Sequence, residues 1–385
     1  MNPFTFNTVG SIVFGEGAAA RIGELAAARA WMRVLLVTDP GIVRLGMAAK
    51  AVEALDGAGV IASVYDKVEA DPPEPVVLAA VDAARHFGAD AIIGLGGGSS
   101  LDVAKLVALL ASGREALKTC YGVGNAKGPR LPLMLVPTTA GTGSEVTPIS
   151  IVTTGTSEKM GVVSPVLLPD VALLDPELTY GLPPHVTAAT GIDAMVHAIE
   201  AHASASANNN PVSRALAREA LRLMGAALER AVKDGSDKAA RADMLLGSML
   251  AGQAFANSPV AAVHALAYPI GGHFHVPHGL SNALVLPHVL RFNAETAGHL
   301  YADIAAIVFP KLAEIGGQGR GAAFAEELSA LSERCGLKPR LREVGIPRDA
   351  LDLLADDAMK QTRLLVNNPR PLARADAFAI YSAAW

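Results

Sequence analysis

The stretch Gly94-Leu95-Gly96-Gly97-Gly98-Ser99-Ser100 decides the fold of the first half of this 385-residue chain. It closes the apolar run Ala91–Leu95, which predicts a strand, and opens the segment Leu101–Ala111, which predicts a helix. Glycines at such a junction let a phosphate approach the backbone closely, and the N–H groups at the start of the helix can bind it. A tight turn without a ligand would need the same glycines, but the strand-then-helix context and the two hydroxyls favour phosphate binding.

Strand and helix patterns alternate on both sides of this loop. Apolar, β-branched runs predict strands at 34–38, 60–65 and 133–136, and Ala-rich runs predict helices at 46–55 and 76–87. Strands that alternate with helices are typical of a parallel sheet with helices on both faces. The first half of the chain is therefore predicted to be an α/β domain.

The acid that could bind a ribose precedes the glycine loop. In the standard dinucleotide fold the glycine motif comes first, and the acid follows about 20 residues later. Here Asp39 ends the strand at 34–38, and the glycine loop follows two strands later, which predicts a dinucleotide-binding domain of non-standard Rossmann order. Asp39 would accept the ribose 2′-hydroxyl and repel a 2′-phosphate, which favours NAD over NADP. An Asp that starts a turn before Pro40-Gly41 is nearly as consistent with the sequence.

A second loop, Pro137-Thr138-Thr139-Ala140-Gly141-Thr142-Gly143-Ser144-Glu145, follows the strand at 133–136. It is rich in small hydroxyl side chains that can hydrogen-bond phosphates or the nicotinamide amide. Two loops of this kind at the ends of neighbouring strands suggest one crevice, which is where α/β sheets bind ligands.

The pattern of the sequence changes near residue 180. The turn and breaker residues Asp175-Pro176 and Gly181-Leu182-Pro183-Pro184 are followed by segments with helical periodicity, at 212–231, 239–255 and 322–335. The β-branched runs do not continue into this part. We therefore predict an α/β domain over residues 1–181 and an all-α domain over residues 182–385.

The predicted helical domain contains a candidate metal site. Asp193 and His197 are four residues apart, so they share one face of an apolar helix, and buried groups of this kind need a partner or a metal. His264 lies in a second apolar segment, and residues 271–279 contain three more histidines. One carboxylate with several imidazoles suits a divalent iron or zinc ion. Any single histidine is better explained as an ordinary core residue, but the combination favours a metal.

Composition limits the partners and the compartment. The net charge of -5 and the lack of a basic block argue against a nucleic-acid partner. The two cysteines, Cys120 and Cys335, form no CxxC pair, which suits a reducing cytoplasm. The segment Met1–Phe14 does not have the pattern of a signal peptide, and no apolar stretch reaches the length of a membrane span. We expect a cytoplasmic protein with neither nucleic acid nor membrane as a partner.

Taken together, these motifs resemble the iron-containing alcohol dehydrogenase family. The resemblance runs in order from Phe14-Gly15 to Asn368-Pro369-Arg370, over nearly the whole chain. The motifs that carry it are Gly96-Gly97-Gly98-Ser99 with Asp102 and Lys105, Pro137 to Glu145, Gly191-Ile192-Asp193-Ala194 with His197-Ala198-Ile199-Glu200-Ala201, His264-Ala265-Leu266-Ala267 and Pro277-His278-Gly279.

The resemblance implies an architecture, an activity and a quaternary structure. It implies a dehydroquinate synthase-like architecture, in which an α/β dinucleotide domain and a helical domain enclose a cleft. The implied activity is a metal-dependent alcohol dehydrogenase or aldehyde reductase that transfers a hydride between NAD(H) and a small alcohol or aldehyde. The segment Phe4–Phe14 resembles an edge strand with which family members form dimers, so a homodimer or a larger homo-oligomer is implied.

The resemblance also implies site residues. The metal, iron with zinc as an alternative, would be bound by Asp193, His197, His264 and His278. Lys159 falls where the family approaches the nicotinamide ribose, and Asp39 matches an acid linked to NAD preference. The cofactor phosphates would lie on Gly97, Gly98 and Ser99, with Thr138, Thr139 and Thr142 alongside.

One position departs from the family pattern. Many members carry a second histidine four residues after the third ligand, where it serves as a proton relay, whereas this chain has Tyr268. The pKa of tyrosine normally lies far from neutrality, so the catalytic acid stays unassigned. A lyase of the dehydroquinate synthase type would need a more basic pocket than these apolar helices offer. A non-enzymatic nucleotide- or metal-binding protein is the alternative from another class.

Overall fold

The computed structural model describes residues 3–155 and 158–385. The chain divides into two compact units. An α/β unit comprises Asn7–Thr139 and Gly143–Tyr180, and a helical unit comprises the N-terminal segment that ends at Phe6, Ala140–Thr142 and Gly181–Trp385. None of the helices in the described residues has both the length and the apolar composition needed to cross a membrane.

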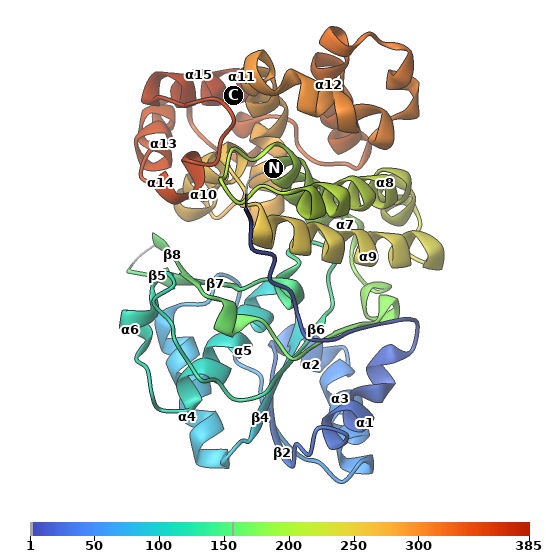
Figure 1. The fold of residues 1–385 in the computed structure, drawn as a ribbon, viewed down its shortest axis with the longest axis vertical. Coiled ribbons are helices and arrows are strands. Elements are labelled where there is room, and N and C mark those ends of the chain that lie inside the picture. The colour runs from blue at the N-terminus through green and yellow to red at the C-terminus, as the bar shows by residue number, and fades with distance from the viewer. Residues whose placement is uncertain (1–2, 156–157) are drawn as a thin grey trace. The chain divides into compact units, whose positions relative to one another are not determined.

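The core of the α/β unit is a six-stranded sheet with the order β1-β9-β6-β4-β2-β3. Figure 1 labels its strands β2, β4 and β6. Every neighbouring pair in this sheet runs parallel, as predicted. The classic Rossmann order is 3-2-1-4-5-6, whereas here the first strand lies at the far edge, so the predicted non-standard order is confirmed. The strands are β1 (Ile12–Phe14), β2 (Arg33–Val37), β3 (Ile61–Tyr65), β4 (Ala91–Gly96), β6 (Leu133–Pro137) and β9 (Val171–Leu174).

Alternating side chains of the central strands build a core on each face of the sheet. Along β2, Leu35 and Val37 join one cluster of buried residues, and Val34 and Leu36 join the other. Because both faces of each central strand are buried, these strands read as continuous apolar runs. The first cluster packs against α4 (Glu74–Phe87) and α5 (Gly98–Ala111), and the second packs against α1 (Ile22–Ala27) and α3 (Met47–Gly57).

A second, three-stranded sheet in this unit was not predicted. It has the order β5-β8-β7, with β5 at Gly122–Val123, β7 at Ile149–Thr154 and β8 at Glu158–Val163. The strands β7 and β8 pair antiparallel, and along β7 Ser150 and Val152 are buried while their neighbours are partly exposed. These strands carry Ser, Thr, Lys and Glu, so they lack the apolar runs by which the strands of the large sheet were recognised.

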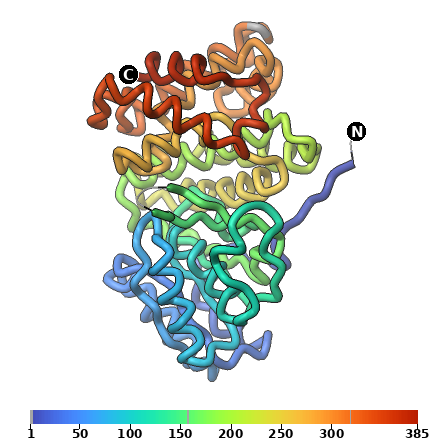
Figure 2. Tube along the Cα trace, turned by 90° about the vertical axis from the view of Figure 1, so that its left-hand side faces the viewer, coloured from blue at the N-terminus to red at the C-terminus, as the bar shows by residue number. Residues whose placement is uncertain are grey.

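Every described element from Pro184 onwards is a helix (Figure 2). The helix α7 is the most enclosed of them, because all of its residues from Gly191 to Ala203 are buried. Asn210 caps α8, its Oδ1 accepting the N–H of Ser213 at 2.9 Å. The longer helices are α7 (Pro184–Ala203), α8 (Pro211–Lys233), α9 (Lys238–Asn257), α10 (Ala262–Phe274), α11 (His278–Val308) and α12 (Gly317–Arg334), followed by α13 (Leu351–Ala358), α14 (Thr362–Leu365) and α15 (Arg374–Ala384).

Candidate metal centre and nucleotide-binding loops

Three polar side chains line one face of the buried helix α7. Asp193, His197 and Glu200 follow one another at spacings of four and three residues, so they lie one above the other along that face. All three are buried. An ionisable group in such a position is costly unless it has hydrogen-bond partners, an opposite charge or a metal.

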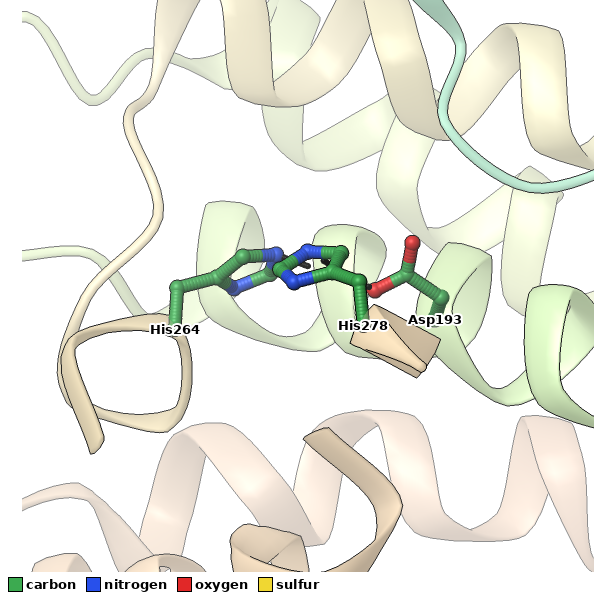
Figure 3. A group of neighbouring side chains, drawn as sticks. All are labelled: Asp193, His264 and His278. Carbon is green, nitrogen blue, oxygen red and sulfur yellow. Dashed lines mark ion pairs between the residues drawn. The ribbon is translucent and has the colours of Figure 1, made fainter. Parts of the chain in front are cut away.

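Asp193 meets two histidines from other helices of the same unit (Figure 3). One ligand atom each from Asp193, His264 and His278 lies within 4.8 Å of the others. Asp193 Oδ1 is 3.9 Å from His264 Nε2 and 3.6 Å from His278 Nε2. Atoms that each bind one ion at about 2 Å are about 3–4 Å apart, so one oxygen and two nitrogens at these distances fit a divalent metal ion.

The neighbours of Asp193 keep its carboxyl group in the anionic form. Burial alone would raise its pKa, but His278, His197 and His264, with a hydrogen bond from Asn282, hold the pKa below its usual value. Burial also lowers the pKa of His197 to about 3, against the opposing effect of Asp193. An anionic carboxylate and a neutral imidazole are the forms that bind metals.

His197 lies beside this group without joining it. Its ring stacks between Phe255, at 4.3 Å between ring centroids, and His264, at 4.8 Å. His197 Nδ1 is buried and has no hydrogen-bond partner among the described residues. The structure thus brings three of the four expected ligands together, and the role of His197 as the fourth stays a prediction.

The other histidines of the 271–279 segment lie elsewhere. His273 pairs with Asp357 at 2.5 Å, and His275 ends α10 in a left-handed conformation with φ 54°. Tyr268, one turn after His264, has its ring 5.8 Å from the ring of His278. The structure therefore puts Tyr268 next to a candidate ligand, while its role in proton transfer stays unassigned.

Two residues at the metal group had no role assigned from the sequence. Glu200 accepts hydrogen bonds from Val263 N–H and His264 Nδ1–H, both at 2.7 Å. Asn282 Nδ2 donates to Asp193 Oδ1 and lies 3.3 Å from Nε2 of both His264 and His278. Their spacing in the sequence could have indicated that both lie at the metal group. Glu200 continues the helix face of Asp193 and His197, and Asn282 follows His278 by one helical turn.

The glycine loop forms the expected junction of strand and helix. The strand β4 ends at Gly96, and Gly97 caps α5. A Cβ on Gly96 would lie 2.7 Å from Ser100 Oγ, and its φ of +149° is one that other residues rarely adopt. The loop therefore needs glycine here, and it leaves the first N–H groups of α5 available at the end of the strand.

Asp39 contacts this loop and also has the local role that the sequence left open. Its Oδ1 accepts the N–H groups of Gly41 and Ile42 at 2.8 and 3.1 Å, so it caps the short helix α2 (Pro40–Arg44). Its Oδ2 accepts the hydroxyl of Ser100 at 3.3 Å. One oxygen thus fixes the turn, and the other lies at the glycine loop.

The second hydroxyl-rich loop begins next to the first. Thr138 N–H donates to Gly96 O at 3.0 Å, and Thr139 is 3.7 Å from the position that a Cβ on Gly97 would take. Thr142 belongs to the short segment Ala140–Thr142, which is part of the helical unit. In that unit Gly141 packs closely on Thr190 of α7. The structure therefore brings Thr138 and Thr139 to the glycine loop within one unit.

Lys159 has its own partners in the second sheet. Its Nζ forms an ion pair with Asp71 at 2.6 Å and donates to Thr153 Oγ1 at 2.9 Å. Its approach to a nicotinamide ribose stays a prediction.

A buried lysine holds the end of the second hydroxyl-rich loop. Lys105 of α5 donates to Ser144 Oγ at 2.8 Å, Thr147 Oγ1 at 3.2 Å and Ile149 O at 2.6 Å. Burial lowers its pKa, an effect that the neighbouring Asp102 opposes. Burial also raises the pKa of Glu145, in the same loop, to about 7. Polar contacts therefore fix this loop against α5.

Comparison with known proteins identifies the family. Residues 10–176 match the iron-containing alcohol dehydrogenase family, and residues 187–385 match the C-terminal domain of the Fe-containing alcohol dehydrogenase family. The chain belongs to this family and is an oxidoreductase that acts on alcohols.

Individual relatives and solved structures agree with this assignment. The chain is 43% identical over 355 residues to long-chain-alcohol dehydrogenase 1 of Geobacillus thermodenitrificans, covering 91% of this chain and 89% of that one. A crystal structure of 1,3-propanediol oxidoreductase superposes with a TM-score of 0.96 at 34% identity, covering 100% of both chains. A sulfoacetaldehyde reductase from Bifidobacterium kashiwanohense in complex with NAD+ gives 0.88 at 28% identity, covering 99% of this chain and 98% of that one.

Proposed function

We propose that this protein binds NAD(H) and one divalent iron ion and interconverts a small alcohol with its aldehyde. The observation that carries the proposal is the group formed by Asp193, His264 and His278, three ligand side chains from three helices. The family to which the chain belongs is named for iron, and an Asp/His donor set serves iron as well as zinc.

The ion would be held by Asp193, His264 and His278, with His197 as the fourth ligand. When bound, it supplies Lewis acidity, which lowers the pKa of an alcohol and polarises an aldehyde carbonyl. Asp193 offers a carboxylate, and burial keeps His197 neutral. Phe255, which stacks on His197, gives the site an apolar side that favours an alkyl chain over a charged substrate.

The α/β unit would bind the dinucleotide. The start of α5 at Gly97, Gly98 and Ser99 offers backbone N–H groups to the phosphates, with Thr138 and Thr139 at the same loop. A contact of Thr142 with the phosphates stays a prediction from the sequence. Asp39 Oδ2, at the same loop, would accept the ribose 2′-hydroxyl and repel a 2′-phosphate, so NAD is preferred to NADP. The NAD+ complex of a sulfoacetaldehyde reductase with a similar fold supports this choice of cofactor. Hydride transfer would then connect the nicotinamide C4 with the carbon that bears the substrate oxygen.

The protein would act as a cytoplasmic homodimer. The strand β1 is at the edge of the large sheet, and Ile12 and Phe14 on it are 38% and 39% exposed. An exposed apolar edge strand is a ready site for pairing with a second copy. Cys120 and Cys335 are both buried and unpaired, which suits a reducing compartment. Analytical ultracentrifugation tests the oligomeric state by comparing the wild type with Ile12→Lys. The variant should shift to the monomer, because it places a charge on the edge strand.

The deciding experiment follows NADH oxidation with a panel of short aldehydes. Metal-stripped protein is measured before and after anaerobic addition of Fe(II), with Zn(II) as a parallel sample. Turnover that depends on the added ion supports the dehydrogenase, and the panel then gives the preferred chain length. Binding of NADH and metal without turnover of any aldehyde would instead support a binding protein.

A further inference from the structure

Glu200 makes two hydrogen bonds to consecutive residues at the start of α10. One carboxylate oxygen accepts the backbone N–H of Val263, and the other accepts His264 Nδ1–H, each at 2.7 Å. Glu200 and His264 are both buried, so solvent does not compete for these bonds. Each oxygen of the carboxylate thus has its own donor within the helical unit.

This contact determines which nitrogen of His264 carries the proton. A carboxylate has only acceptor atoms, so Nδ1 must be the donor. In the neutral ring Nε2 then keeps its lone pair, and Nε2 is the atom that lies 3.9 Å from Asp193 Oδ1 in the candidate metal group. A histidine protonated at Nε2 would have no lone pair at that atom to give to an ion.

We propose that Glu200 is a positioning residue of the metal site: it holds His264 in the Nδ1–H tautomer and in the orientation that presents Nε2 to the ion. The proposal rests on the metal site of the proposed function. The carboxylate acts through His264, and it contacts none of the other candidate ligands by a hydrogen bond in the described residues. Partners of this kind to metal-binding histidines commonly set both the tautomer and the affinity.

The carboxylate cannot be replaced by an amide of the same shape. Glutamine has one acceptor oxygen, whereas Val263 N–H and His264 Nδ1–H are two donors. In Glu200→Gln the amide NH2 would therefore face a donor. We expect the amide oxygen of the glutamine to keep its hydrogen bond from the backbone N–H of Val263, so that its NH2 group faces His264 Nδ1–H. These two donors no longer oppose each other if the proton of His264 moves to Nε2, because Nδ1 can then accept from the amide. That exchange removes the lone pair from the atom that should bind the ion.

A neighbouring residue provides a matched control. Glu200 lines a small cavity together with Tyr301, Asn293 and Asn368. Tyr301 is buried, and its hydroxyl accepts from Asn293 Nδ2 at 3.2 Å. No hydrogen bond between Tyr301 and His264 is present in the described residues, so Tyr301→Phe changes the same cavity and leaves the histidine contact intact.

The test measures Co(II) binding to metal-stripped protein by calorimetry. Glu200→Gln should weaken the affinity about 10- to 100-fold, while Tyr301→Phe should bind as the wild type does. The visible absorption of the bound Co(II) should change in Glu200→Gln, because the ligand set loses or rearranges one imidazole. Equal affinity and an unchanged spectrum in Glu200→Gln would overturn the proposal, as would an equal loss in Tyr301→Phe.

Imidazole nitrogen NMR on the wild type gives a second, independent test. With 15N-labelled histidine and metal-stripped protein, His264 should show a protonated Nδ1 and an unprotonated Nε2, with assignment by the His264→Asn spectrum. The Nε2–H tautomer would contradict the proposal even if Glu200→Gln did not fold. If the wild type bound no divalent ion, the metal site itself would be wrong, whereas the tautomer would still report on Glu200.

Discussion

The two units carry their candidate sites in different ways. In the α/β unit the site consists of backbone N–H groups and small hydroxyls at the ends of neighbouring strands, where Gly96 and Thr138 meet. In the helical unit it consists of side chains buried on helices, and Asp193, His264 and His278 come from three of them. The first arrangement depends on backbone shape, and at Gly96 it leaves no room for an added Cβ. The second depends on the charges and donor atoms of the side chains, which the buried helices bring together.

The largest effect should come from the helical unit. Asp193 is the proposed carboxylate ligand of the ion, so in Asp193→Ala kcat/KM for aldehyde reduction should fall about 1000-fold or more. NADH binding, measured by fluorescence, should change little, because the substitution leaves the proposed phosphate- and ribose-binding residues of the α/β unit unaltered. His299→Ala, an exposed histidine on α11, is the matched control and should keep full activity. Equal losses in both variants would remove the support for this ligand.

The α/β unit should instead be sensitive to a single methyl group. Gly96→Ala places a Cβ 2.7 Å from Ser100 Oγ and at a φ of +149°. Strain and overpacking should lower the free energy of unfolding by about 2–4 kcal/mol and weaken NADH binding. Gly57→Ala in α3 has no atom within 4 Å of the added Cβ, so it should be neutral or slightly stabilising in the same urea titration. A Gly96→Ala protein as stable as Gly57→Ala would contradict the close-packed loop.

The helical unit should lose stability in acid. Burial lowers the pKa of His202 to about 4 in the folded protein, against an ordinary value of 6.5. Below pH 6.5 His202 takes up a proton in the unfolded chain but stays neutral in the folded one. Its contribution to the free energy of unfolding therefore falls by about 2–3 kcal/mol between pH 6.5 and pH 4. His202→Leu should flatten that part of the urea-midpoint profile. Both ring nitrogens of His202 are without hydrogen-bond partners in the described residues, so the variant should be close to the wild type at pH 8.

The α/β unit should show the opposite dependence on pH. Burial raises the pKa of Glu145 from 4.5 to about 7. The folded state therefore holds a proton that the unfolded chain has released, and stability falls by about 2–3 kcal/mol as the pH rises from 4.5 to 7. Glu145→Gln should remove this fall, and hydrogen exchange of peptides from α5 and β6 should locate it in the α/β unit. An unchanged profile would show that Glu145 is ionised at no cost.

The smallest effect concerns the choice of cofactor. Asp39→Ser removes the charge near the glycine loop but keeps a group that can cap α2. The preference for NADH over NADPH, measured as a ratio of kcat/KM values, should fall about tenfold or more, because the repulsion of a 2′-phosphate is lost. Asp39→Asn retains the shape without the charge and should give a similar shift. A constant ratio would leave Asp39 with its capping role alone.

The features that depend on short stretches of sequence could be predicted. The glycine loop, the parallel strands around it and the loss of strands in the second half follow from local patterns, and the structure and the family confirm this fold class. The β7–β8 pair was missed because polar residues interrupt its apolar ones and most of its residues are partly exposed. Its pairing is between neighbours in the chain, yet neither strand has the apolar run of a buried parallel strand.

Contacts between distant helices were harder to predict. The spacing of Asp193 and His197 indicated one helix face, but it could not show that His264 and His278 would approach Asp193 while His197 stacks on His264. The hydrogen bond that His264 Nδ1–H donates to Glu200 spans 64 residues, so no local spacing encodes it. The ion-pair partner of Lys159 could not be predicted either, because Asp71 is remote from it in the sequence.

The three side chains in Figure 3 belong to helices whose connections differ greatly in length. An ion bound to all three would therefore cross-link these segments of the chain in addition to supplying Lewis acidity, and this cross-link could be removed with the ion. Ion binding and folding would then be linked equilibria. Free ion at 100 times its dissociation constant would add about 2.7 kcal/mol to the free energy of unfolding. Removal of the ion would then lower the free energy of unfolding of the helical unit, and not only the rate of turnover.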